Sequence, residues 1–104
     1  MGEDAVGQYR IIAYIDDMEE AMRLGKKSGF KEDLIGDIKN IHEETVDMSS
    51  LLETEEHYDI LKTALEDLLG RLKETCLNND EKGASDIVDE LGNTVKRLTE
   101  KLSE

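Results

Sequence analysis

The residues most able to carry chemistry in this sequence are its two histidines and its single cysteine, the side chains on which catalytic and metal sites are often built. A di-metal helical bundle needs a glutamate three residues before each ligating histidine. Lys39 precedes His42 at that spacing and Thr54 precedes His57. The chain also lacks HExxH, CxxC, P-loop and Rossmann glycine patterns. We therefore expect no metal, no cofactor and no enzymatic activity.

His42 lies in the string IKNIHEETVDM, within the segment that we expect to form the second of four helices. A histidine at this place resembles the arrangement in histidine phosphotransfer domains, and the resemblance implies that His42 accepts a phosphoryl group. In that family lysine and then glycine occupy the positions held here by Thr45 and Val46. His42 and Glu43 also resemble the phosphoacceptor box of sensor kinases, without its proline or its threonine or asparagine. Phosphotransfer through His42 is therefore kept as the alternative function.

Cys76 is interpreted as a small apolar residue. It lies near the expected C-terminal end of a helix, where the helix dipole disfavours a thiolate. One cysteine cannot form an internal disulfide, which fits a reducing compartment. No hydrophobic run reaches the length of a membrane span, and Met1–Ala5 does not resemble a signal sequence. We expect a cytoplasmic location.

Acidity dominates the composition. The 104 residues include 26 acidic and 13 basic ones, a formal net charge of −13, which argues against direct binding to nucleic acid or an anionic membrane. The sequence thus favours a non-enzymatic protein-protein interaction module, such as an inhibitor, an immunity or antitoxin protein, or a chaperone, that binds a partner with a basic surface. The candidate partner-binding residues form three runs: Asp16, Asp17, Glu19, Glu20, Glu43, Glu44, Asp47, Glu53, Glu55 and Glu56.

These side chains must be positioned by helices, because apolar residues recur at steps of three and four along most of the chain. The clearest stripes are Tyr58, Leu61, Leu65, Leu68 and Leu72, widened by Leu69 and Cys76, and Ala84, Ile87, Leu91, Val95, Leu98 and Leu102. Before them come Leu34, Ile38, Ile41, Thr45, Met48 and Leu52. The first stripe is Val6, Tyr9, Ile12, Ile15, Met18 and Met22, broadened by Ile11 and Ala21.

We predict helices over residues 5–25, 31–53, 54–77 and 84–102, in a single helical domain of residues 1–104. Two stretches separate them clearly: Gly25 to Gly29, a loop that carries Lys26 and Lys27, and a polar turn over 78–83. Asp80 or Ser85 is expected to cap the last helix. Residues 49–57 contain neither glycine nor proline, so one long helix over 31–77 is the alternative there.

Four amphipathic helices of this length predict an all-α fold, an up-down-up-down four-helix bundle. The alternative is an intertwined helical dimer with a long central helix, since such a helix could not fold back on itself. A structural homo-oligomer is accordingly a third candidate function. It predicts that the apolar stripes stay uncovered within one chain.

Overall fold

The computed structural model describes residues 2–103 of the chain, and side chains from Ile11 to Ser103. Throughout this range the regular structure is helical. The elements are α1 (Gly2–Ser28), α2 (Glu32–Met48), the short 3-10 helix η1 (Ser49–Leu51), α3 (Glu55–Leu77) and α4 (Glu81–Ser103). The predicted all-α, four-helix fold is confirmed.

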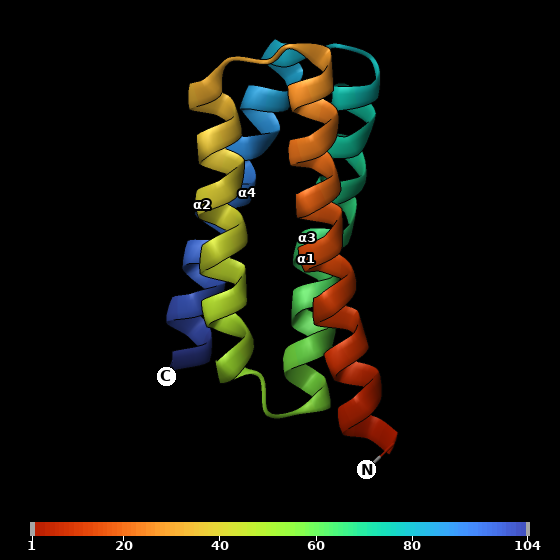
Figure 1. The fold of residues 1–104 in the computed structure, drawn as a ribbon. Helices are drawn as coiled ribbons and strands as arrows, with labels where there is room; N and C mark the ends of the chain where they lie inside the picture. The colour runs from red at the N-terminus through yellow and green to blue at the C-terminus, as the bar shows by residue number, and fades with distance from the viewer. Residues whose placement is uncertain (1, 104) are drawn as a thin grey trace.

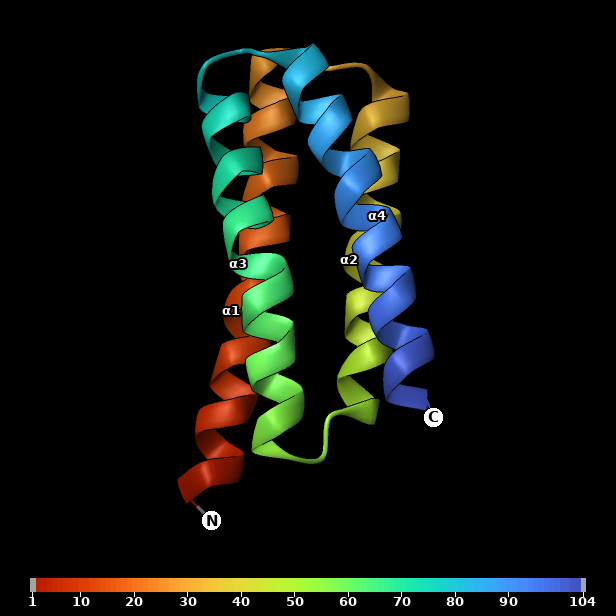
Figure 2. The ribbon, with the colours of Figure 1, turned by 180° about the vertical axis from the view of Figure 1, so that it is seen from behind.

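The four helices form a bundle in which the chain reverses direction at each connection (Figures 1 and 2). The pairs with extensive contacts are α1 with α2, α1 with α3, α3 with α4, and α2 with α4. Consequently α2 and α3, although consecutive, lie at diagonal corners. The first and last described residues lie toward the same end of the bundle (Figure 1).

Two tight turns close the opposite end of the bundle, and both use a left-handed residue. Gly29 has φ of +80° and donates to the Lys26 carbonyl at 3.1 Å, while the Phe30 N–H donates to the Gly25 carbonyl at 3.0 Å. These two bonds define a Schellman motif, in which glycine is favoured because it has no Cβ to clash at positive φ. As a result α1 continues to Ser28, and the prediction that Lys26 and Lys27 lie in a loop is wrong.

Asn79 is the left-handed residue that ends α3, as Gly29 is for α1. It adopts φ of +57°, and the Asp80 N–H donates to the Thr75 carbonyl at 2.9 Å. Asp80 then caps α4, because its Oδ1 accepts the Gly83 N–H at 3.0 Å. Of the two predicted caps Asp80 is therefore correct, and α4 begins at Glu81, three residues earlier than predicted.

The break between α2 and α3 settles the question of one helix or two. α2 ends at Met48, η1 follows, and Leu52 takes an extended conformation. The Thr54 hydroxyl then accepts the His57 N–H at 3.2 Å and begins α3. A single helix over 31–77, and with it the long central helix of the dimer alternative, is absent. The predicted second helix also extends five residues too far at its C-terminal end, because those residues form η1 and the extended link.

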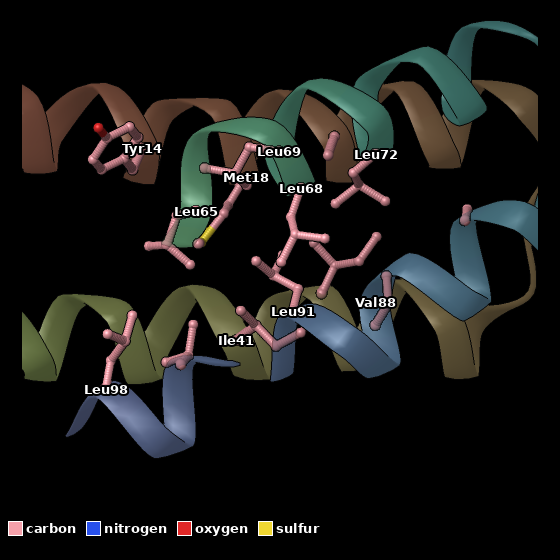
Figure 3. Packing of buried hydrophobic residues seen from close by; sticks show 14 of the residues in the cluster. Tyr14, Met18, Ile41, Leu65, Leu68, Leu69, Leu72, Val88, Leu91 and Leu98 are labelled. Carbon is pink, nitrogen blue, oxygen red and sulfur yellow. The ribbon is translucent and has the colours of Figure 1, made fainter. Parts of the chain in front are cut away.

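The core is formed by apolar side chains from all four helices. Figure 3 shows Leu65, Leu68 and Leu72 of α3 directed toward the side where Ile41 and Leu91 lie. Full burial of one such aliphatic side chain stabilises the fold by about 1.5–3 kcal/mol. Every member of the stripe predicted for the second helix is buried, and so are Leu61 and Cys76. The stripes therefore cover one another within a single chain.

The stripe predicted for the first helix is rotated from the one observed. Ile11, Tyr14 and Ala21 are buried with Met18, whereas Ile12 is 50% exposed. Ile15 and Met22 lie at the edge of the core. Two overlapping three-and-four patterns exist in this segment, and packing against both α2 and α3 selects the one centred on Met18. Val6 and Tyr9 lie outside the described side chains.

Candidate protein interface on α2

The acidic run of α1 is divided between two neighbouring helices. Asp17 turns toward α3, where its Oδ1 lies 3.1 Å from Nζ of Lys73, and Oε2 of Glu20 lies 3.8 Å from the same nitrogen. Glu19 turns toward α2 and contacts His42. Only Asp16 of this run lacks an ion pair with any described side chain. Three of the four carboxylates in this run therefore have charged partners within the fold.

The contact with Asp17 also changes the pKa of Lys73. The hydrogen bond to Asp17 raises the pKa of Lys73 above its ordinary value, and the charges of Asp17 and Glu20 add to this effect against a partial desolvation. The ammonium group thus stays charged at neutral pH. This positive charge neutralises part of the negative charge of the acidic run on α1.

His42 is held between α2 and α1. Its Nε2 lies 3.1 Å from Oε1 of Glu19, and its side chain is only 19% exposed. One of its two ring nitrogens is therefore already engaged by a carboxylate. This geometry gives the phosphotransfer alternative no specific support.

The second acidic run belongs to the most negatively charged helix. α2 carries six carboxylates and one lysine, a net charge of −5 over 17 residues, whereas α4 has −1 over 23. All six carboxylates are exposed, and none forms an ion pair with a described residue. We call them the α2 acidic surface: Glu32, Asp33, Asp37, Glu43, Glu44 and Asp47.

Two exposed aliphatic side chains border this surface on the α1 side. The contact of Glu19 with His42 fixes the antiparallel register of α1 and α2. Ile15 and Val46 lie one helical turn further along that register, because residues four apart share a helix face. Val46 is 43% exposed and Ile12, next to this position on α1, is 50% exposed. The carboxylates thus border a small apolar area.

The third predicted run lies at the start of α3. Glu55 and Glu56 occupy its first turn, where free backbone N–H groups favour carboxylates. The Glu53 N–H donates to Nδ1 of His57 at 3.2 Å, so His57 completes a capping arrangement with Thr54. All three glutamates are exposed, and helix initiation explains the positions of Glu55 and Glu56.

The remaining reactive groups do not form a site. Cys76 is fully buried, its Sγ lies 3.6 Å from the Ala21 carbonyl oxygen, and burial raises the pKa of its thiol. Lys26 and Lys27 occupy the last turn of α1, where positive charge stabilises the helix. Among the described residues no group of histidine, cysteine and carboxylate side chains is arranged to hold a metal ion. Nor does this part of the chain include a helix sufficiently long and apolar to cross a membrane.

Sequence reasoning included Glu43, Glu44 and Asp47 but left out Glu32, Asp33 and Asp37. Glu32 and Asp33 lie in the first turn of α2, where free backbone N–H groups favour carboxylates, and Asp37 lies outside any acidic run of the sequence. The missing signal was the charge of the whole segment: between Lys31 and Lys62 there is a single lysine and no arginine. Net charge per helix would have identified this surface.

Comparisons with known proteins give no family for this chain: no family model, no curated protein and no solved structure matches it. The geometry and charge of the surface are therefore the basis for a functional proposal.

Proposed function

We propose that this protein is a non-enzymatic interaction module that binds a basic protein partner through the α2 acidic surface. The observation that carries the proposal is the set of six exposed carboxylates on α2 without an ion pair inside the described part of the chain. On α1, by contrast, Asp17, Glu19 and Glu20 have partners within the fold.

Electrostatics gives such a surface a specific role. Like charges on one helix repel one another, and a lysine- or arginine-rich partner relieves that repulsion and is steered toward the surface. The apolar area around Val46 and Ile12 supplies contacts that exclude water, while the carboxylates form a charged rim. Binding of this kind weakens as salt screens the charges, because the Debye length falls from about 10 Å at 0.1 M to about 3 Å at 1 M.

The other candidate functions have less support. Burial of the apolar stripes within one chain removes the reason for a structural homo-oligomer, and the contact of His42 with Glu19 leaves phosphotransfer without a supporting observation. A cytoplasmic location stays part of the proposal, on the grounds of the buried, unpaired Cys76.

Affinity capture from an extract of the source cells tests the proposal. The immobilised full chain should retain a basic protein at low salt and release it at about 1 M salt, where screening is nearly complete. The captured protein should then bind the purified chain with the same salt dependence in calorimetry. Retention of only acidic or neutral proteins, or affinity unchanged by salt, contradicts the proposal.

A further inference from the structure

A groove of about 310 Å³ lies between α2 and α4, next to the α2 acidic surface. Ile41 and Val88 form its apolar floor, and both are almost fully buried by the surrounding side chains. Asp37 and Glu44 of α2 line it, as does Asp89 of α4. The groove therefore combines an apolar base with carboxylates on both of its walls.

Gly92 keeps this groove open. It lies in the middle of α4, where glycine is the least favourable residue after proline. A Cβ placed there would lie 3.6 Å from Cδ1 of Ile41, an ordinary van der Waals distance. Close packing of the helices thus does not require glycine at this position. A longer side chain at Gly92 would instead occupy the groove above Ile41.

The charges of the groove select a cation. Asp37, Glu44 and Asp89 are exposed and form no ion pair with described residues, and Lys96 is the only basic residue that lines it. These three carboxylates and one lysine give the groove a net charge of −2, so a cation that enters it is favoured in spite of Lys96. An arginine fits better than a lysine, because its planar group donates five hydrogen bonds and can pair with more than one carboxylate.

We propose that the groove between α2 and α4 receives an arginine side chain of the basic partner, with its methylene groups over Ile41 and its guanidinium among Asp37, Glu44 and Asp89. This inference rests on the proposed function, since it names the side chain by which the partner is held. It adds a specific pocket to a surface that otherwise attracts cations only through its charge.

Butylguanidinium is a suitable probe, with the neutral butylurea of nearly the same shape as its control. Titration of either compound into the ¹⁵N-labelled full chain is followed by amide chemical shifts. Butylguanidinium should give saturable shifts at residues 89–93 of α4 and 37–44 of α2, and butylurea should give none. Asp37→Asn or Asp89→Asn should weaken binding about two- to fivefold each, the range expected for a partly exposed ion pair.

Substitution of glycine provides the steric test. Gly92→Met fills the groove and should abolish the saturable shifts. Gly70→Met is the matched control, because Gly70 also lies inside a helix, on α3, and a Cβ there meets nothing within 4 Å. Both changes improve helix propensity equally. Shifts spread over all acidic residues without saturation, or shifts that survive Gly92→Met, would overturn the inference.

Failure of this inference can be told from failure of the proposed function. If a basic protein is captured in a salt-dependent manner but Gly92→Met captures it as well as Gly70→Met does, the groove is not used and the proposed function stands. If no basic protein is captured, the proposed function fails, and the butylguanidinium titration still reports whether the groove binds the cation.

Discussion

Nζ of Lys73 on α3 lies 3.1 Å from Oδ1 of Asp17 on α1, and this contact joins two helices that run in the same direction. Lys73 also lies near Glu20, so one ammonium group meets two carboxylates. The acidic run of α1 consequently contributes to the packing of the bundle. Among the four helices α2 has the largest net negative charge, and its six carboxylates form no ion pair with a described residue.

Replacement of Lys73 tests this contact. Lys73→Gln should lower the free energy of unfolding by about 0.5 kcal/mol at neutral pH, the usual value for an exposed ion pair. Because the pKa of Lys73 is raised in the folded state, its contribution is complete below the ordinary value of 10.5 and is lost as pH rises through the higher folded value. Urea unfolding in a double-mutant cycle with Asp17→Asn measures the coupling. A coupling of zero at low salt and neutral pH would contradict the assigned contact.

Cys76 should behave as a protected thiol. It is fully buried and its pKa is raised by desolvation, so little thiolate forms and reagents reach it only when the chain opens. We expect alkylation by iodoacetamide to be slow in the native protein and fast in concentrated urea, with Cys76→Ala as the unlabelled control. Equal rates in both conditions would show that Cys76 is accessible. Cys76→Ala itself should cost about 1 kcal/mol of stability through the small cavity that it leaves.

Thr54 should be important for the start of α3. Its hydroxyl accepts the His57 N–H, so Thr54→Ala should destabilise the fold by about 1 kcal/mol. Thr63→Ala is the control. Thr63 is an exposed residue within the same helix, and its hydroxyl donates a hydrogen bond to the Asp59 carbonyl of the preceding turn. Thermal unfolding of both variants gives the comparison. If both variants unfold like the original protein, the capping role is refuted.

Asn79 offers a stabilising substitution. Asn79→Gly should raise the free energy of unfolding by about 0.5–1 kcal/mol, because glycine adopts positive φ without a Cβ clash. Asn78→Gly is the matched control: Asn78 has φ of −90°, so glycine there only adds freedom to the unfolded chain and should destabilise. The two variants should therefore shift the urea midpoint in opposite directions. Shifts of the same sign would contradict the Schellman assignment.

The fold class could be predicted from the sequence because apolar residues recur at helical spacing in all four helices. On α4 the predicted stripe is correct except that Val88 is buried, whereas Ile87 and Leu102 are only partly buried. Residues such as Leu65 and Leu91 had to be inside whatever the arrangement of the helices was. Helix ends were less predictable. Gly25 resembles a stop signal, but the left-handed residue that ends α1 is Gly29, and only the backbone conformation distinguishes them.

Part of the α2 acidic surface could also be predicted from the sequence, because the apolar spacing of α2 identifies its buried face. Glu43 and Asp47 are polar positions of a helix whose buried stripe is unambiguous, so their exposure could be expected. The fate of Asp17 and Glu20 could not, because it depends on the rotation of α1 and on Lys73, a residue 56 positions further along the chain than Asp17. That α1 packs beside α3 is a fact of the tertiary arrangement.

The most direct test of the central claim compares two triple variants with the same change in charge. One removes three carboxylates of the α2 acidic surface, Glu43→Gln, Glu44→Gln and Asp47→Asn. The other removes three exposed carboxylates of α4, Asp86→Asn, Glu90→Gln and Glu100→Gln. We predict that the basic protein captured at low salt by the original chain is lost with the α2 variant and kept with the α4 variant. Equal loss with both variants would show that net charge alone attracts the partner and would contradict the assignment of the binding surface to α2.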